Sequence, residues 1–169
     1  MTGTAAIVTS VRLVWFVVAR IPLINRIVLR RAFPISECKN RCLLDVPGDH
    51  ARFELTASRP SAALTGLAVN FHNHLPFDVE FEVWRVKAVV TSYQLLDAVL
   101  NTRCMVPAAG TANVSLPEVT LSDQQADWMR GRNTDCSRTQ FELHWRCRSK
   151  FHDWEGGGHF QFLAYLSKD

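Results

Sequence analysis

Two histidines and three acidic residues lie within one short stretch of the chain, and side chains of these types can bind a metal or transfer protons. They are His72, His74, Asp78, Glu80 and Glu82. A zinc site needs at least three converging ligands. Asn73, His74 and Pro76 instead separate two runs of alternating apolar residues, which is typical of a turn. We therefore expect a turn followed by a solvated strand face, and no metal site.

The motifs of the common enzyme classes are missing from the sequence. It has no GxSxG, HExxH, Walker or GxGxxG motif. Cys147 is a potential nucleophile near His144, but odd and even positions of one strand face opposite sides of a sheet. The glycines at 156–158 are expected in a hairpin turn, where positive φ is needed. We expect a protein without catalytic residues, cofactor or small-molecule substrate.

Five cysteines are an odd number in a chain that has enough apolar residues to fold without disulfides. Cys38 and Cys42 form a CxxxC pair, and Cys136 and Cys147 would face each other on neighbouring strands. The sequence leaves both bridges open.

Basic residues are concentrated near the N-terminus. Seven lysines and arginines but only two acidic residues precede position 46, whereas the formal net charge of the whole chain is +3. The remainder therefore carries a negative net charge. Such an asymmetry points to a basic arm that meets an anionic partner, either membrane headgroups or nucleic acid.

The first 33 residues have the pattern of two amphipathic helices. Arg12 and Arg20 interrupt the apolar stretch from Thr4 to Ile21, which does not suit a helix spanning a membrane. Pro22 separates it from a second piece with arginines one turn apart. Apolar stripes edged by arginine are typical of helices at a membrane interface. The candidate contacts with lipid or a partner are Arg12, Trp15, Phe16, Arg20, Arg26, Arg30 and Arg31.

The same arm has other interpretations. It suits a helix that packs on the domain's own core or on a partner subunit. Because the first 36 residues contain arginine, serine and threonine but no acid, they also resemble a mitochondrial targeting segment, whereas a secretory signal peptide fits poorly. We expect a membrane-associated protein, with the mitochondrial inner membrane as one compatible compartment.

After residue 51 the hydrophobic period changes from helical to alternating, as in the runs ending at Ala57, Phe71 and Val83. The segment LSDQQADWMRG breaks this pattern, and Ser122 with Gln125 forms a capping box. The sequence predicts a mainly β protein, an antiparallel β-sandwich with one short inserted helix. Its expected organisation is an amphipathic arm over 1–33, a linker over 34–50 and the sandwich domain over 51–169.

A basic stripe is predicted on the penultimate strand, facing away from the core. Its members are His144, Arg146, Arg148 and Lys150. The stripe suits phosphates of nucleic acid or lipid headgroups. Nucleic acid is the poorer fit because no exposed aromatic residues are interleaved for base stacking. The simplest alternative is that these side chains pair with acids such as Glu80 and Glu82.

The order of the elements resembles the water-stress (WHy-type) late-embryogenesis-abundant β-sandwich family over about residues 52–166. The resemblance rests on the strand ending in LAVNFHN, the proline-marked turn, the turn PAAG, the strand with LPEVTL, the short helix and the final hairpin. Where that family usually has Asn-Pro, this chain has NHLP from Asn73 to Pro76. The resemblance implies a fibronectin-like sandwich without catalytic residues, often behind an N-terminal membrane anchor, with membrane, lipid or protective roles.

Two functions are compatible with these patterns. The first is a non-catalytic, membrane-attached β-sandwich whose arm meets anionic lipid and whose domain binds lipid or protein. The second is an accessory structural subunit of a large membrane complex, mitochondrial in one version, in which the arm packs on neighbouring subunits.

Overall fold

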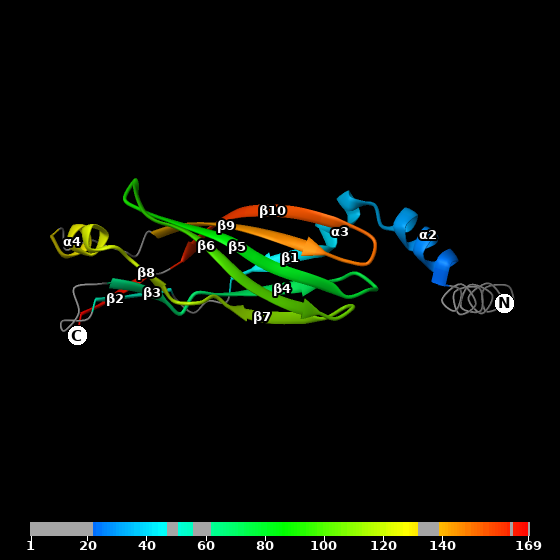
Figure 1. Ribbon diagram of the computed structural model, residues 1–169, viewed down its shortest axis with the longest axis horizontal. Helices are drawn as coiled ribbons and strands as arrows, with labels where there is room; N and C mark the ends of the chain where they lie inside the picture. The colour runs from blue at the N-terminus through cyan, green and yellow to red at the C-terminus, as the bar shows by residue number, and fades with distance from the viewer. Residues whose placement is uncertain (1–21, 47–50, 56–61, 132–138, 163, 169) are drawn as a thin grey trace, which may run out of the picture.

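The computed structural model describes residues 22–46, 51–55, 62–131, 139–162 and 164–168. Strands dominate these residues and form two packed layers (Figure 1). One layer is an antiparallel sheet in the order β10-β9-β5-β6. Its strands are β5 (Val79–Val90), β6 (Tyr93–Val106), β9 (Thr139–Arg148) and β10 (Asp153–Phe162). The predicted mainly β sandwich is confirmed.

The second layer consists of two short sheets, and the chain passes back and forth between them. The first has the order β1-β4-β7, with strands β1 (Cys42–Asp45), β4 (Ala68–Asn73) and β7 (Thr111–Ser115). The second has the order β11-β2-β3-β8, with strands β2 (Arg52–Leu55), β3 (Ala62–Thr65), β8 (Val119–Thr120) and β11 (Tyr165–Lys168). β11 pairs with β2 in parallel, unlike the other described pairs.

A glycine marks the break between these two short sheets. Gly66, between β3 and β4, has φ of 73°, a conformation that side chains with a Cβ rarely adopt. Next to it the Leu116 N–H donates to the Leu67 carbonyl at 2.8 Å, so pairing continues across the break. The second layer is therefore one surface, interrupted at Gly66.

Alternation along the strands builds the core between the layers. Along β4 every second side chain is fully buried, including Val69 and Phe71. Phe71 stacks on Phe81 of β5 with ring centroids 4.2 Å apart, and Phe141 of β9 meets Phe162 of β10 edge-on at 4.8 Å. Buried aromatic pairs of this kind contribute beyond their area. The Phe71–Phe81 pair ties the two layers together, and the Phe141–Phe162 pair packs within the four-stranded sheet.

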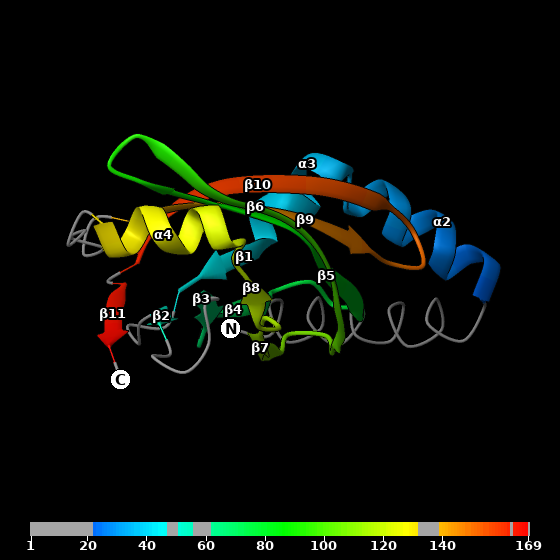
Figure 2. The same cartoon turned by 60° about the vertical axis from the view of Figure 1, so that its left-hand side comes forward.

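The helices lie at the two ends and along one edge (Figures 1 and 2). The described helices are α2 (Pro22–Ala32), α3 (Ile35–Arg41) and α4 (Asp123–Gly131). α4 is the predicted inserted helix, and its capping box is confirmed because the Ser122 N–H donates to Gln125 Oε1 at 2.7 Å. Its residues Ala126 and Met129 are fully buried and dock it on the sandwich.

Two local predictions are wrong. The range 34–50 was expected to be a loop-like linker, yet α3 and β1 occupy residues 35–45 and β1 pairs with β4. β1 is only four residues long, too short for alternation to be evident. The glycines at 156–158 lie within β10, paired with β9, and the hairpin turn falls at residues 149–152.

Candidate functional site

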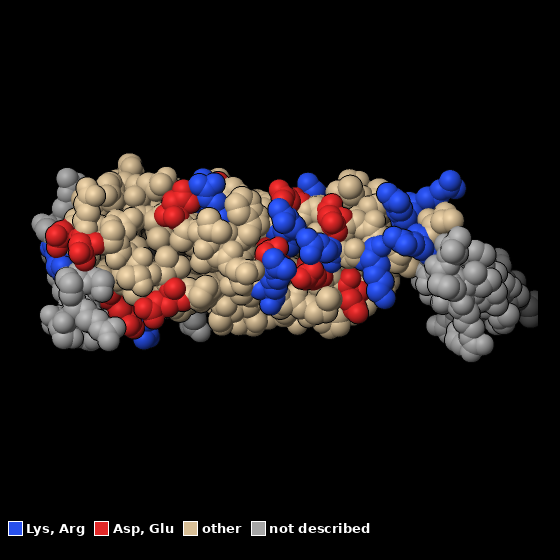
Figure 3. All heavy atoms as spheres, viewed as in Figure 1, with Lys and Arg blue, Asp and Glu red and all other residues tan. Residues whose placement is uncertain are grey.

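α2 carries the described part of the basic arm. It begins at Pro22, whose fixed φ suits the first helical position, and ends with Arg30 and Arg31 in its last turn, where cations interact favourably with the helix dipole. Arg26, Arg30 and Arg31 are exposed, and none forms an ion pair with another described residue. Figure 3 shows Lys and Arg side chains gathered over the part of the molecule where α2 lies.

Apolar side chains stand beside these arginines. Ile27 is 52% exposed and Val28 38% exposed, whereas Leu29 is buried. α2 therefore presents a cationic and apolar surface together. The other predicted contacts, Arg12, Trp15, Phe16 and Arg20, lie outside the described residues. Among the described helices, none has the length and apolar content to cross a membrane.

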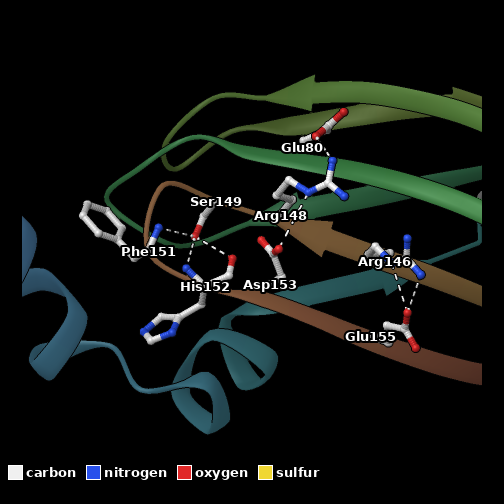
Figure 4. Close-up of polar contacts among 8 residues, drawn as sticks. All are labelled: Glu80, Arg146, Arg148, Ser149, Phe151, His152, Asp153 and Glu155. Atoms are coloured by element: carbon white, nitrogen blue, oxygen red, sulfur yellow. Dashed lines mark hydrogen bonds and ion pairs between the residues drawn. The ribbon is translucent and has the colours of Figure 1, made fainter.

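The predicted basic stripe of β9 is in place but is paired with acids (Figure 4). Arg146 Nε and Nη2 donate to Glu155 Oε1 on β10 at 3.0 and 2.7 Å. Arg148 Nη1 lies 3.4 Å from Glu80 Oε2 on β5, and its Nε lies 3.8 Å from Asp153 Oδ2. The sequence alternative of pairing with Glu80 is therefore correct.

The pairing extends across the whole outer face of the sheet. Glu155, Arg146, Glu82 and Arg103 stand opposite one another on four successive strands, so charge alternates along the row. Arg103 Nε donates to Glu82 Oε1 at 2.9 Å. Five cations, Arg85, Lys87, Arg103, Arg146 and Arg148, thus face six carboxylates. Blue and red are accordingly interspersed over this sheet in Figure 3.

These contacts shift the pKa values of the groups on this face. The hydrogen bond from Arg85 lowers the pKa of Asp97, and the hydrogen bond from Lys87 lowers the pKa of Glu142. The pKa of Arg146 is raised, chiefly by its hydrogen bond to Glu155. Each shift favours the charged form. The face is therefore an ordered network of ion pairs at neutral pH.

One member of the predicted stripe is placed differently from expectation. Lys150 is exposed but lies beyond β9, in the turn that leads to β10. Ser149 closes this turn, because its Oγ accepts hydrogen bonds from the N–H groups of Phe151 and His152 at 3.2 and 3.0 Å (Figure 4). His144 is on the strand, with its ring beside Trp84 at a centroid distance of 5.4 Å. The stripe thus keeps His144, Arg146 and Arg148, each beside a carboxylate, and His144 Nε2 lies 2.8 Å from Glu142 Oε1.

The acidic residues Asp78, Glu80 and Glu82 do not form the solvent-exposed strand face that we expected. Asp78 is exposed, but its Oδ1 accepts a hydrogen bond from the Ala108 N–H at 3.0 Å. Glu82 is only 8% exposed, because it lies in the middle of the charged row. Alternation alone does not reveal that β6 and β9 flank β5 and place basic side chains beside its acidic ones.

Asn73, expected as a turn residue, is a fully buried structural centre at the end of β4. Its Nδ2 donates to the carbonyls of Phe77 and Pro107, both at 2.9 Å, and its Oδ1 accepts from the Leu75 N–H at 3.0 Å. A buried amide with satisfied partners fixes loop positions. The asparagine of the NHLP stretch therefore holds two neighbouring turns together.

Among the described residues, His72 and His74 do not belong to a group of side chains that could bind a metal ion. His72 Nδ1 lies 3.0 Å from Thr111 Oγ1, and its ring stacks on that of His74. Within the described residues no three histidine, cysteine or acidic side chains are grouped closely enough to bind a metal ion.

The described cysteines are unpaired thiols. Cys38 and Cys42 are both free, so the bridge between them that the sequence left open is absent, and Cys136 lies outside the described residues. Burial raises the pKa of Cys42 to about 12 and also raises the pKa of Cys147. A thiol that stays protonated is a poor nucleophile. His144 and Cys147 also lie on opposite faces, as expected.

One hollow was missed by sequence reasoning. A pocket of about 520 Å³ lies beside α3 and the edge strand β10. Three tryptophans line it: Trp84, Trp145 and Trp154. The available signal was the run of glycines at 156–158, because glycine within a strand often marks a close approach.

Comparison with protein-family models and with curated proteins finds no match. Solved structures give remote likenesses. A structural-genomics target designated SoR45 has a TM-score of 0.47 at 11% identity, covering 74% of this chain and 87% of that one. A protein from Archaeoglobus fulgidus has a TM-score of 0.39 at 9% identity, covering 71% and 92%. Red sea bream transglutaminase has a TM-score of 0.37 at 11% identity, covering 86% of this chain and 19% of the enzyme. These likenesses assign no function.

Proposed function

We propose that this protein is a non-catalytic, membrane-associated β-sandwich of the WHy type that attaches to anionic lipid through its N-terminal arm. The observation that carries the proposal is the surface of α2. Arg26, Arg30 and Arg31 are exposed without an acidic partner among the described residues, and Ile27 and Val28 stand exposed beside them. Cations edged by apolar side chains suit a headgroup layer.

The contrast with β9 supports this choice of surface. Arg146 and Arg148 already contact carboxylates, so anionic lipid would have to displace those partners. The absence of enzyme motifs and the raised thiol pKa values support a binding or structural role. The resemblance of the element order over about residues 52–166 to the WHy-type family agrees with a sandwich behind a membrane anchor.

Co-sedimentation of the full chain with vesicles tests the proposal. We expect salt-sensitive binding to phosphatidylglycerol vesicles and little binding to phosphatidylcholine vesicles. Replacing Arg26, Arg30 and Arg31 together by glutamine should weaken binding about 100-fold, at about 1 kcal/mol for each cation. The matched control replaces Arg146 and Arg148 by glutamine and should bind nearly as the unmodified protein does.

Equal loss of binding in the two variants would move the lipid surface to the strand. If the unmodified chain binds no vesicle and purifies in fixed proportion with other proteins, the accessory-subunit alternative replaces the proposal. In that case the apolar residues of α2 would contact protein.

A further inference from the structure

β6 forms an open edge of the four-stranded sheet. The sheet order places it last, and among the described residues its only strand partner is β5. The opposite edge strand, β10, has α3 beside it. At 14 residues β6 is also the longest of the described strands. An edge strand presents unpaired N–H and C=O groups, which a further strand can join through main-chain hydrogen bonds.

The C-terminal half of β6 lacks the charges and prolines that usually protect such an edge. Residues 98–106 contain no proline and one charged side chain, Arg103, which already donates a hydrogen bond to Glu82 of β5. Two apolar side chains stand on exposed positions of this segment: Val99 is 81% exposed and Met105 is 65% exposed. They are the most exposed large apolar side chains described in the molecule.

The same half of β6 has a regular strand pattern. From Leu96 to Val106, exposed positions alternate with buried or half-buried ones without interruption. The pairing with β5 shifts register at Trp84, but the alternation along β6 continues past that point. The free edge can therefore pair with a neighbouring strand in a constant register.

A two-fold axis at Thr102 makes this segment complementary to itself. In the antiparallel pair that results, Val99 lies opposite Met105 of the other strand, so the two exposed apolar side chains cover each other. Thr102 lies opposite its own copy. The other pairs are Leu100 with Cys104, Asn101 with Arg103 and Ala98 with Val106. Apolar pairs and threonine pairs across strands are stabilising, and no two like charges are opposed.

Neighbouring registers fit less well. An axis one residue earlier would set Val99 against Arg103. An axis two residues earlier would bring Met105 to Leu95, whose carbonyl already accepts a hydrogen bond from Gln125 of α4. The axis at Thr102 keeps the paired segment clear of α4.

We propose that the chain forms a symmetric dimer in which β6 pairs with β6 of a second copy about Thr102. Each copy contributes the same surface, as in most homodimers. The two four-stranded sheets then continue into one sheet. The interface uses no residue of α2, so it goes beyond the proposed attachment to lipid and holds or fails separately from it.

Sedimentation equilibrium of the full chain tests the dimer. Val99→Lys combined with Met105→Lys sets like charges opposite each other at both ends of the paired segment. It should raise the dissociation constant of the dimer about 100-fold. Val99→Lys combined with Met105→Glu sets opposite charges at the same places and should restore the affinity to within about tenfold of the unmodified chain.

The control adds the same charge away from β6. It combines Ile35→Lys and Leu43→Lys, at exposed apolar positions of α3 and of the edge strand β1, and should leave the dimer unchanged. Circular dichroism shows whether each variant is folded. A second measurement needs no variant: hydrogen-exchange protection of amides 98–106 should rise with protein concentration, whereas that of β10 should not.

Three results would each overturn the proposal. They are a monomeric unmodified chain, a dimer that the two lysines on β6 leave intact, and equal affinities of the two folded β6 double variants. A chain that binds phosphatidylglycerol vesicles but is monomeric would remove the dimer and keep the attachment through the arm.

Discussion

The arginines of α2 and those of β9 are the same residue type in opposite circumstances. On β9, Arg146 and Arg148 stand between strands that carry glutamate and aspartate at matching positions. On α2, Arg26, Arg30 and Arg31 have no such neighbours among the described residues. A sheet brings distant acids to each strand residue, whereas a helix on the outside retains only its own sequence neighbours. The number of cations therefore says little about a surface until their partners are known.

Removal of the acidic partners should convert the strand face into a binding surface. The test starts from the variant in which the three α2 arginines are replaced by glutamine. It then also replaces Glu80, Asp153 and Glu155 with the corresponding amides. Two freed arginines should raise the affinity for phosphatidylglycerol vesicles about 30-fold, at about 1 kcal/mol each. Co-sedimentation measures the gain.

The control for this change neutralises three acids of the other layer, Asp45, Glu54 and Glu118. It alters the net charge equally without releasing either arginine of β9. An equal gain in both chains would mean that net charge, and not pairing, separates the two regions.

Single alanine substitutions should separate the regions by stability. Glu82 has a side chain only 11% exposed and depends on Arg103, so Arg103→Ala should lower the free energy of unfolding by about 1–2 kcal/mol. Arg30→Ala removes no described contact and should change it by less than about 0.5 kcal/mol. Urea denaturation followed by fluorescence measures both. Equal losses would contradict the claim that only the strand cations are structural.

Acid should weaken the strand network and spare the arm. Because Asp97 and Glu142 have lowered pKa values in the folded state, they stabilise the fold above their unfolded pKa values, about 4. That contribution is lost as the pH falls through the folded pKa values. The arginines of α2 stay charged throughout.

Urea midpoints measured between pH 7 and pH 3 check this expectation. The chain with Asp97→Asn and Glu142→Gln should show a shallower dependence. An identical slope in that chain would assign the acid sensitivity to other carboxylates.

The sequence was sufficient for the fold class because period two and the capping box are local signals. Ser122 with Gln125 identified α4, and the alternation around Phe71 and Phe141 identified core strands. β1 was missed because four residues carry too little periodicity. The glycines of β10 were assigned to a turn because their reason for being glycine, the ring of Trp145, comes from another strand.

The sequence was likewise sufficient for only part of the candidate site. The exposed arginines of α2 were identified from helical spacing alone, since neighbours on a helix are near in sequence. The sequence offered Glu80 as a partner of the β9 stripe only as an alternative and did not assign it to Arg148, because Glu80 is 68 residues away and only the register of β5 with β9 brings them together. The pocket needed four strands and a helix to assemble.

The break at Gly66 has a consequence for how the molecule opens. It divides one layer into two short sheets, while β5 and β6 run unbroken along the other. We therefore expect the β11-β2-β3-β8 end and the β1-β4-β7 end to open as separate units. Amide hydrogen exchange should show two cooperative units within the second layer, with their boundary at Gly66.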